Sequence, residues 1–409
     1  MSLSNLYPTI SPSLLLDFAN SGVLDPGVTL TRLTGGTYFG PDGVLRTAQA
    51  NAPRIDFDPS TLVCRGLLVE EQRANLMTYS EEFNDVTWLK QNVTVTPNDV
   101  AAPNGTLTAD LVVDDTSVAL QNHRVHAAPT TTAGVTHTAS FFVRNIDATW
   151  VHIRDGTNGI SCWFNLATKT IGINQFSSAM ITEVGNQWLR LSVTWAPATA
   201  SSSIGIGFAP SDGVNLYTTS TNTSIHIWGA QLEAGSFPTS YIPTTSTAVT
   251  RAADVASVNT LSPWFNASEG TLFAEYGNIA QTISGVGRRI FTVSDGTSSN
   301  QISLRWADVS AITNVSVTES GSAQVIITGD VSGTSKAALA YKINDFAISR
   351  DGGAAIIDPS GNVPAVNIAY MGLNADGATT ASTMLNGYLR RIAYYPVRLP
   401  NAQLQALTA

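Results

Sequence analysis

Apolar residues alternate with polar or aromatic ones along short segments through most of the chain. In residues 188–193 the order is Trp-Leu-Arg-Leu-Ser-Val, so every second side chain is aliphatic. Turn-forming pairs such as Asp155-Gly156 and Asp212-Gly213 separate one such segment from the next. Alternation with a period of two is typical of β-strands with one buried face, and short strands separated by turns favour antiparallel sheets over βαβ units. The sequence therefore predicts an all-β fold.

The distribution of these segments predicts two antiparallel sandwiches in series, of jelly-roll and concanavalin-like type, after a turn-rich N-terminal extension. Residues 1–65 are dense in turn formers, and their strand-like pieces are too short for a core of their own. The two sandwiches are expected at residues 66–245 and 258–409, each of which holds a series of alternating segments. Residues 246–257 are expected to be a linker, because Pro243 and a run of Thr and Ser lie at their start.

Composition favours the same fold class. The chain has 43% apolar and 12% charged side chains, and Lys is rare. A chain rich in β-branched residues and poor in Lys and Glu suits strands better than helices. Helical turns are expected only at residues 70–76 and 400–407, where Leu404 and Leu407 fall three positions apart.

Charge and hydropathy exclude two classes of partner. The formal net charge is −9 at pH 7, and no basic cluster is longer than the pairs Arg288-Arg289 and Arg390-Arg391. Nucleic-acid binding needs a positive footprint, so we expect no nucleic-acid partner. No stretch approaches the roughly 18 consecutive apolar residues of a membrane span, so we expect no membrane insertion.

The N-terminus and the cysteines bear on the compartment in which the protein is made. Residues 1–8 have neither the basic region nor the apolar region of a secretory signal peptide. Cys64 and Cys162 are too few for a disulfide framework, and two free thiols are the favoured interpretation. These features predict synthesis in a reducing cytoplasm.

Motifs of catalytic, cofactor and metal sites are missing from the sequence. There is no G-x-S-x-G nucleophile elbow, and Gly285-Val286-Gly287 lacks the third glycine of a dinucleotide-binding loop. His123 and His126 have the spacing of a metal pair, but no Cys or carboxylate ligand lies nearby in the sequence. We therefore predict no catalytic residue, no metal and no cofactor.

Glycoside hydrolysis is the enzyme activity that sandwich folds most readily suggest. The reaction needs two carboxylates about 5 to 9 Å apart. The adjacent pairs Glu70-Glu71 and Glu81-Glu82 would point to opposite faces of an extended strand. Carboxylates from distant strands would leave no signal in the sequence, so a polysaccharide-degrading enzyme is kept as the third alternative for the function.

Four segments of the predicted middle sandwich combine an aliphatic side with a side rich in Trp, His and Arg. In residues 150–154, Val151 and Ile153 point one way and the other side chains point the opposite way. Three further segments repeat this division. The second side comprises Trp150, His152, Arg154, Trp163, Trp188, Arg190, His226 and Trp228.

The composition of this second side suits a sugar platform. Flat indoles stack on the apolar C–H face of a sugar ring, while Arg and His donate hydrogen bonds to its hydroxyls. We therefore predict a glycan-binding face on these strands. The alternative is that the N-terminal extension or a neighbouring subunit covers the tryptophans, with arginine satisfying buried carbonyls.

Several runs of the sequence resemble those of tailed-phage structural proteins. Residues 54–59 (RIDFDP), 65–76 (RGLLVEEQRANL) and 79–84 (YSEEFN) resemble a recurring signature of these virion proteins. Residues 228–244 (WGAQLEAGSFPTSYIPT) resemble the end of their carbohydrate-binding-like jelly roll. Residues 385–396 (LNGYLRRIAYYP) are similar to the last strand of their concanavalin A-like, laminin-G-like domain.

The resemblance implies a virion protein of a tailed phage or prophage: a fibre, a tail appendage or a head decoration. It implies a location in the virion after assembly in the host cytoplasm, and contacts with other virion proteins through residues 1–65. A homotrimer is expected, because phage appendages are commonly trimeric. The resemblance brings no catalytic residues. Calcium binds some laminin-G-like relatives, but this sequence has no matching acidic cluster, so no calcium site is predicted.

Two functions from different classes follow from these observations. The first is a non-enzymatic fibre or tail appendage that binds a host surface glycan or receptor through the face of Trp, His and Arg. The second is a purely structural head or tail decoration protein, in which that face is sealed in an interface. The position of the tryptophans, exposed or covered, distinguishes the two.

Overall fold

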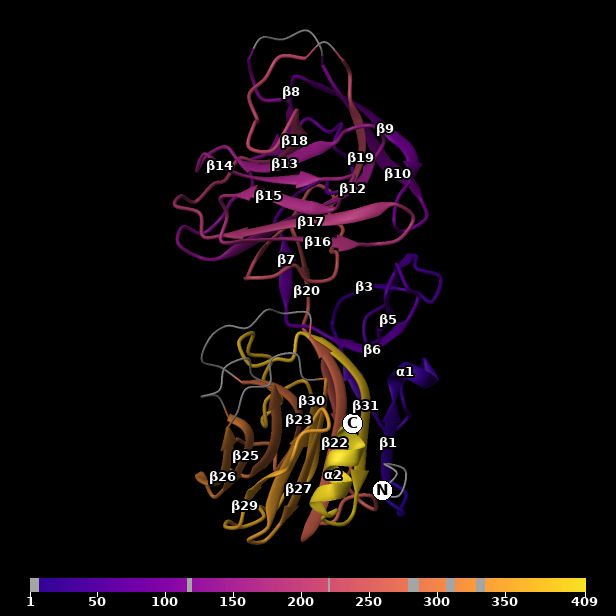
Figure 1. Cartoon of the computed structure of the whole chain (residues 1–409), viewed down its shortest axis with the longest axis vertical. Helices are drawn as coiled ribbons and strands as arrows, with labels where there is room; N and C mark the ends of the chain where they lie inside the picture. The colour runs from indigo at the N-terminus through magenta and orange to yellow at the C-terminus, as the bar shows by residue number, and fades with distance from the viewer. Residues whose placement is uncertain (1–6, 116–119, 220, 279–286, 307–312, 329–334) are drawn as a thin grey trace.

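The computed structural model is dominated by β-strands and confirms the predicted all-β fold. It describes residues 7–115, 120–219, 221–278, 287–306, 313–328 and 335–409. Within these ranges the helices are α1 (Phe18–Ser21) and α2 (Asn401–Thr408), and neither is long or apolar enough to cross a membrane. Two sandwiches lie one above the other in Figure 1, with the N-terminal segment, in indigo, beside the lower one.

The middle sandwich consists of two six-stranded antiparallel sheets, which we name the β12 sheet and the β13 sheet after a central strand. The β12 sheet has the order β16 (Ser178–Glu183), β17 (Trp188–Trp195), β12 (His137–Asn145), β19 (Ser224–Ala234), β10 (Leu107–Asp114) and β9 (Val93–Ala101). The β13 sheet has the order β15 (Thr170–Asn174), β14 (Ile160–Asn165), β13 (Trp150–Asp155), β18 (Ile204–Ala209), β11 (Arg124–Ala127) and β8 (Leu89–Gln91). The aliphatic faces of the two sheets meet in the core, as the alternation predicts.

The C-terminal sandwich pairs an eight-stranded sheet with a seven-stranded one. The first has the order β29 (Ile356–Asp358), β28 (Phe346–Arg350), β27 (Lys336–Lys342), β22 (Glu269–Asn278), β31 (Gly387–Tyr395), β6 (Cys64–Val69) and β5 (Ile55–Phe57), with β1 (Leu14–Asp17) also paired to β31. The second has the order β2 (Thr29–Thr31), β21 (Val255–Val258), β30 (Ile368–Met371), β23 (Arg288–Ser294), β24 (Gln301–Trp306), β25 (Thr313–Glu319) and β26 (Ser322–Thr328). Helix α2 packs on β27 and β28 through Leu404.

Most strands of the N-terminal zone belong to the C-terminal sandwich; the two strands of the hairpin at residues 36–48 are the exception. Leu67 of β6 lies opposite Leu389 of β31, β1 pairs with the same strand, and β2 pairs with β21. Strand pairing therefore crosses the boundaries predicted at residue 65 and over residues 246–257. The physical reason is that these short strands have no core of their own, so they bury their apolar side chains at the open edges of that sandwich.

Two small sheets lie between the sandwiches. Strand β7 (Arg73–Asn75) pairs with β20 (Val249–Arg251), and β3 (Gly36–Phe39) forms a hairpin with β4 (Leu45–Ala48). Residues 70–76 therefore hold a strand where a helical turn is expected, whereas α2 lies where the sequence predicts it. Tertiary contacts override helix propensity here, because the Asn75 side chain bonds the backbone of residues far away in the sequence: Ala230, Leu232 and Ile242.

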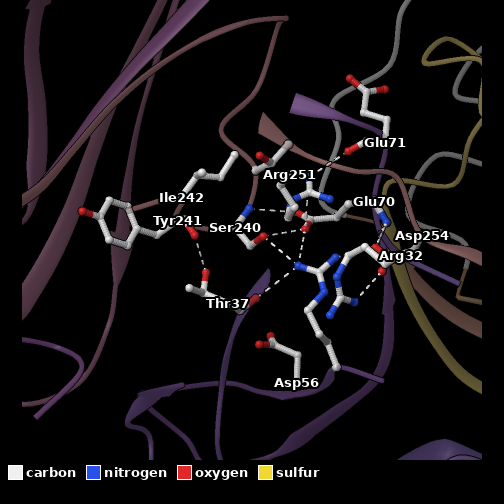
Figure 2. A network of polar contacts seen from close by, with 12 residues as sticks. Arg32, Thr37, Asp56, Glu70, Glu71, Ser240, Tyr241, Ile242, Arg251 and Asp254 are labelled. Atoms are coloured by element: carbon white, nitrogen blue, oxygen red, sulfur yellow. Dashed lines mark hydrogen bonds and ion pairs between the residues drawn. The ribbon is translucent and has the colours of Figure 1, made fainter. Parts of the chain in front are cut away.

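Buried ion pairs join these segments at the junction (Figure 2). Arg54 pairs with Asp254 and with Glu70, whose Oε2 lies 2.7 Å from Nη1 of Arg54. Nη1 of Arg32 lies 2.9 Å from Oδ1 of Asp254, and Nη2 of Arg251 lies 3.5 Å from Oε2 of Glu70. These side chains are almost fully buried, where charges are tolerated only when they are paired and hydrogen-bonded. The network therefore fixes how the N-terminal zone, β6 and the segment after β20 meet.

Candidate functional site

The residues of the predicted glycan face lie on two different sheets. The β13 sheet holds Trp150, His152, Arg154 and Trp163. The β12 sheet holds Trp188, Arg190, His226 and Trp228. Because the sheets pack through their aliphatic faces, the two groups lie on opposite outer faces of the sandwich. The prediction of one continuous face is therefore wrong, since both sheets of a sandwich carry the same alternation.

The β3–β4 hairpin and the segment after β19 cover the outer face of the β12 sheet. Trp188 and Trp228 are 2% and 1% exposed and share a cluster with Leu45 of the hairpin. The ring centroids of Trp228 and Tyr241 are 4.6 Å apart. On this sheet the structure thus has the alternative arrangement, in which the N-terminal zone covers the tryptophans.

Arg190 and His226 of the β12 sheet are also engaged within the protein. Arg190 donates from Nη1 to the backbone oxygen of Thr239 over 2.7 Å, and from Nη2 to Oγ of Ser140 over 2.9 Å. Nε2 of His226 lies 2.8 Å from Oδ2 of Asp99. Arg190 therefore satisfies oxygen atoms of the protein itself, as the packing alternative requires.

The outer face of the β13 sheet brings together side chains from β11, β13 and β14. Strand register places one row of neighbours across the sheet in the order Arg124, Gly207, His152 and Trp163. The adjacent row has the order His126, Gly205, Arg154 and Ser161. We name the arginine face after its two cations and define it by Arg124, His126, His152, Arg154, Ser161 and Trp163.

Two glycines of β18 let side chains from the neighbouring strands approach each other. A Cβ atom on Gly207 would lie 2.8 Å from Cε1 of His152 and 2.7 Å from Cβ of Arg124. Those two side chains therefore occupy the space above β18. At Gly205 a Cβ atom would clash with Cβ of His126, so a side chain from β11 approaches there as well. Residues 204–208, Ile-Gly-Ile-Gly-Phe, carry the sequence signal for this approach, because glycine within a strand marks a place where other groups come close.

The charges of Arg124 and Arg154 have no direct carboxylate partner among the described residues. Arg124 donates to Oγ of Ser203 over 3.3 Å, and Arg154 donates to Oγ of Ser161 over 3.1 Å. Burial, and then the charge of Arg154, lowers the pKa of Arg124 to about 10. The carboxylate of Asp155 accepts a hydrogen bond from the indole of Trp195 and pairs with neither arginine. Its charge nevertheless raises the pKa of both arginines. The arginine face is therefore positively charged on a chain whose net charge is −9.

The two histidines of the arginine face are neutral at pH 7. Burial, and then the charges of the two arginines, lowers the pKa of His152 to about 3. Burial, and then Arg124, lowers the pKa of His126 to about 4. In the part of the chain that the structure describes, the ring nitrogens of His152 meet no partner of ordinary hydrogen-bond geometry, beyond a weak approach to the backbone of Phe208. A neutral imidazole carries one N–H donor, and the donor of His152 lies beside the two arginines without a hydrogen bond of ordinary geometry.

The two indoles of the β13 sheet differ in exposure. Trp163 is 3% exposed, and its Nε1 donates to the backbone oxygen of Val214 over 3.2 Å. The segment that follows β18 therefore lies over Trp163, and the expectation that this indole offers an open stacking surface is wrong. Trp150 is half-buried and is the indole of the predicted set that keeps a surface open to solvent.

His123 and His126 do not form a pair on one side of β11. His123 is buried, stacks on Tyr217 with ring centroids 4.3 Å apart, and has its Nδ1 2.5 Å from Oδ1 of Asp114. Nδ1 of His126 instead lies 3.0 Å from Oγ of Ser203 on the outer face. The described residues include no group of three or more His, Cys, Asp or Glu side chains that could hold a metal ion.

A cavity of about 110 Å³ lies between the β3–β4 hairpin, the β12 sheet and β31, and its lining includes Asp56 and Glu70. Burial raises the pKa of Asp56 to about 6. Burial opposes ionisation of Glu70 as well, but the charges of Arg251 and Arg54 lower the pKa of Glu70 to about 2. Carboxylates with well-separated pKa values suit acid–base chemistry. However, Glu70 is held in the ion-pair network, and the cavity is below the roughly 300 Å³ at which small-molecule sites begin.

No protein-family model matches this sequence, and neither does any curated protein. Among solved structures, the chain is similar to the N-terminal CBM22-1–CBM22-2 tandem domain of Xyn10C from Paenibacillus barcinonensis, with 10% identity and a TM-score of 0.25 over 80% of this chain and 97% of that one. It is also similar to the sialidase of Trypanosoma rangeli in complex with the inhibitor DANA, with 12% identity and a TM-score of 0.26 over 73% of this chain and 60% of that one. At these values the two likenesses assign no role to any residue of this chain.

Proposed function

We propose that this protein is a non-enzymatic virion protein of a tailed phage, a fibre or tail appendage, that binds a host surface glycan through the arginine face. The observation that carries the glycan part is the pair Arg124 and Arg154, which bring cationic donors to an outer sheet face without a carboxylate partner among the described residues. The virion part rests on the resemblance of residues 54–59 and 228–244 to tailed-phage structural proteins.

The chemistry of the arginine face suits a saccharide in three ways. A guanidinium fork donates to two neighbouring oxygen atoms at once, which matches adjacent sugar hydroxyls. The half-buried indole of Trp150, two positions from His152 on β13, offers a flat surface for the C–H face of a sugar ring. Oγ of Ser161 and of Ser203 hold the two arginines, so less side-chain entropy is lost when a ligand binds.

Attachment to the particle is proposed for turns of the N-terminal zone. Strands β1, β2 and β5 of this zone belong to the C-terminal sandwich and the β3–β4 hairpin covers the β12 sheet, so turns between these elements are the parts proposed to face a partner. Val23 and Leu33 lie in such turns and are 62% and 83% exposed, as apolar contacts to another virion protein require. The homotrimer and the location in the virion are proposed from the phage resemblance alone.

A structural decoration protein is the second candidate. The observation that favours it is the burial of Trp163, Trp188 and Trp228, which leaves the half-buried Trp150 as the one indole of the predicted set with solvent-accessible surface to offer. A decoration protein needs no saccharide on the arginine face and would cover that face with a neighbouring virion subunit.

A cell pull-down tests the proposed function. The purified protein is incubated with intact host cells and with cells whose surface polysaccharide has been removed. We expect binding to the intact cells and loss of binding after removal. Binding to both kinds of cell would indicate a protein receptor and contradict the glycan proposal, and binding to neither would favour the decoration protein.

Matched variants locate the binding surface in the same assay. The double variant Arg124→Gln and Arg154→Gln should lose cell binding while its thermal unfolding stays cooperative. Arg46→Gln is the control, because Arg46 is an exposed arginine on the β3–β4 hairpin, which lies against the opposite sheet. Equal binding by both variants would place the glycan site elsewhere.

A further inference from the structure

We infer that the saccharide bound by the arginine face is acidic, with one carboxylate held between Arg124 and Arg154. This inference rests on the proposed function and adds the chemical class of the ligand. Three features of the described residues carry it: the placement of the two arginines, their lack of a direct carboxylate partner, and the imidazole of His152, whose ring nitrogens make no hydrogen bond of ordinary geometry.

Arg124 and Arg154 flank the same strand of the β13 sheet. Arg124 of β11 lies opposite Gly207 of β18, and Arg154 of β13 lies opposite Gly205, two positions along. The glycines have no side chains of their own, and the space above them is taken by the side chains of His152 and His126. The guanidinium of Arg124 reaches across β18 to the end of β13, where a Cβ atom on Gly156 would lie 2.8 Å from its Nη2. Gly156 is two positions from Arg154, so both cations lie near this end of β13.

Two positive charges this close together favour the binding of an anion between them. After burial, the charge of Arg154 is what most lowers the pKa of Arg124, so the two cations disfavour each other. The hydroxyls of Ser161 and Ser203 accept hydrogen bonds from them but bring no negative charge, and the carboxylate of Asp155, which raises the pKa of both, pairs with neither. A carboxylate between the arginines would supply that charge, and its two oxygens match the fork geometry of a guanidinium.

His152 provides a further donor at the same place. It is fully buried, its neighbours in the strand register are Gly207 and Trp163, and its ring nitrogens lack a partner of ordinary geometry within the described ranges. Buried polar groups are normally hydrogen-bonded, so a donor that makes no hydrogen bond of ordinary geometry beside two cations can take an acceptor from outside the chain. A carboxylate of the ligand could accept this hydrogen bond and also supply the negative charge between the arginines. A sugar hydroxyl could accept the hydrogen bond but would bring no charge.

Titration calorimetry with charged and uncharged forms of the same sugars tests the inference. The probes are short oligosaccharides of galacturonate, glucuronate, mannuronate and sialate, each compared with its own methyl ester, which keeps the shape and removes the charge. We expect at least one acid to bind about tenfold or more tightly than its ester. This preference should shrink as NaCl is raised, because salt screens partly exposed charges.

Variants of the two arginines show whether the preference arises at this face. Arg124→Gln and Arg154→Gln should each weaken binding of the acid about tenfold and leave binding of the ester nearly unchanged. Arg154→Lys should retain part of the preference, because it keeps the charge without the fork. Arg46→Gln should behave as wild type, and thermal unfolding of each variant checks that it is folded.

The outcomes separate the inference from the proposed function. Equal affinity for acids and esters, or binding of neutral oligosaccharides alone, would overturn the acidic ligand and leave glycan binding intact. Binding of intact host cells without binding of any acidic probe would have the same consequence. Failure to bind every saccharide and the intact cells would overturn both proposals.

Discussion

Trp228 and Tyr241 pack with their ring centroids 4.6 Å apart beneath the β3–β4 hairpin. Nε1 of Trp228 donates to Oγ1 of Thr108 over 3.1 Å, and the hydroxyl of Tyr241 lies 2.7 Å from Oγ of Ser80. Aromatic residues on an outer sheet face thus form a second small core between the N-terminal hairpin and the middle sandwich. The two outer faces of this sandwich therefore differ: one joins the N-terminal zone, and the other carries the arginine face.

Truncation of Trp228 should destabilise the protein without touching the candidate site. Trp228→Ala would leave a cavity beneath the hairpin, and we expect it to lower the free energy of unfolding by about 3–5 kcal/mol. Saccharide binding by the folded variant should be unchanged, because the arginine face lies on the opposite sheet. Urea denaturation followed by tryptophan fluorescence measures the loss, and a change below about 1 kcal/mol would contradict the packing described for this side chain.

Trp150 and Trp163 should respond differently to the same substitution. Trp150→Ala removes a half-buried indole, so we expect a small change in stability and a clear loss of saccharide affinity. Trp163→Ala removes a buried indole that donates to the backbone of Val214, so we expect a loss of stability instead. Titration calorimetry measures the saccharide affinity of both variants, and thermal unfolding measures their stability. Unchanged affinity in Trp150→Ala would remove this indole from the site.

Because of Asp56, the free energy of unfolding should fall as the pH rises from about 4 to about 6. Burial raises the pKa of Asp56 in the folded protein to about 6, above its ordinary value of 3.8. The folded state therefore holds the proton more tightly than the unfolded chain, so this contribution is fully present below about pH 4 and is lost as the pH passes 6. A pKa difference of about 2 corresponds to about 3 kcal/mol.

The variant Asp56→Asn isolates this effect from the other titrating groups. Its amide oxygen can still accept the hydrogen bond from the backbone N–H of Phe39, which is 2.7 Å long in the native protein. We expect the free energy of unfolding of the variant to change less than that of the wild type between pH 4 and pH 7. The same pH dependence in both proteins would contradict the raised pKa.

The ion-pair network at the junction should be sensitive to the loss of one carboxylate. Asp254→Asn removes the partner of Arg32 and Arg54, and all three side chains are fully buried. Because guanidinium groups would remain buried with less counter-charge, we expect a loss of about 3–5 kcal/mol in the free energy of unfolding. Asp42→Asn is the matched control: its 2.8 Å pair with Arg46 is exposed and should leave Tm unchanged. Similar Tm values for the two variants would show that the network contributes little.

Alternation along the strands predicted the inner faces of the middle sandwich. Leu189, Leu191 and Val193 all point into the core, as a period of two requires. The same pattern could not predict what covers the outer faces, because that depends on clusters such as the one that holds Leu45 and Trp228, which are far apart in the sequence. A period of two identifies the side chains that share a face and does not identify the segment that lies against that face.

The candidate site was predictable only in part. His152 and Arg154 followed from the alternation of β13, but Arg124 comes from the short strand β11, whose place beside β18 depends on long-range pairing. The glycines at positions 205 and 207 were the available signal, because glycine in a strand indicates close approach. The junction network was not predictable either, since Arg54 and Asp254 are brought together by the pairing of distant strands.

A crystal structure with the most tightly bound acidic oligosaccharide bears most directly on the central claim. We predict that its carboxylate lies within hydrogen-bond distance, about 2.7–3.2 Å, of both Arg124 and Arg154, with a sugar ring against Trp150. A saccharide bound to the C-terminal sandwich, or bound at the arginine face with its carboxylate turned toward solvent, would contradict that prediction.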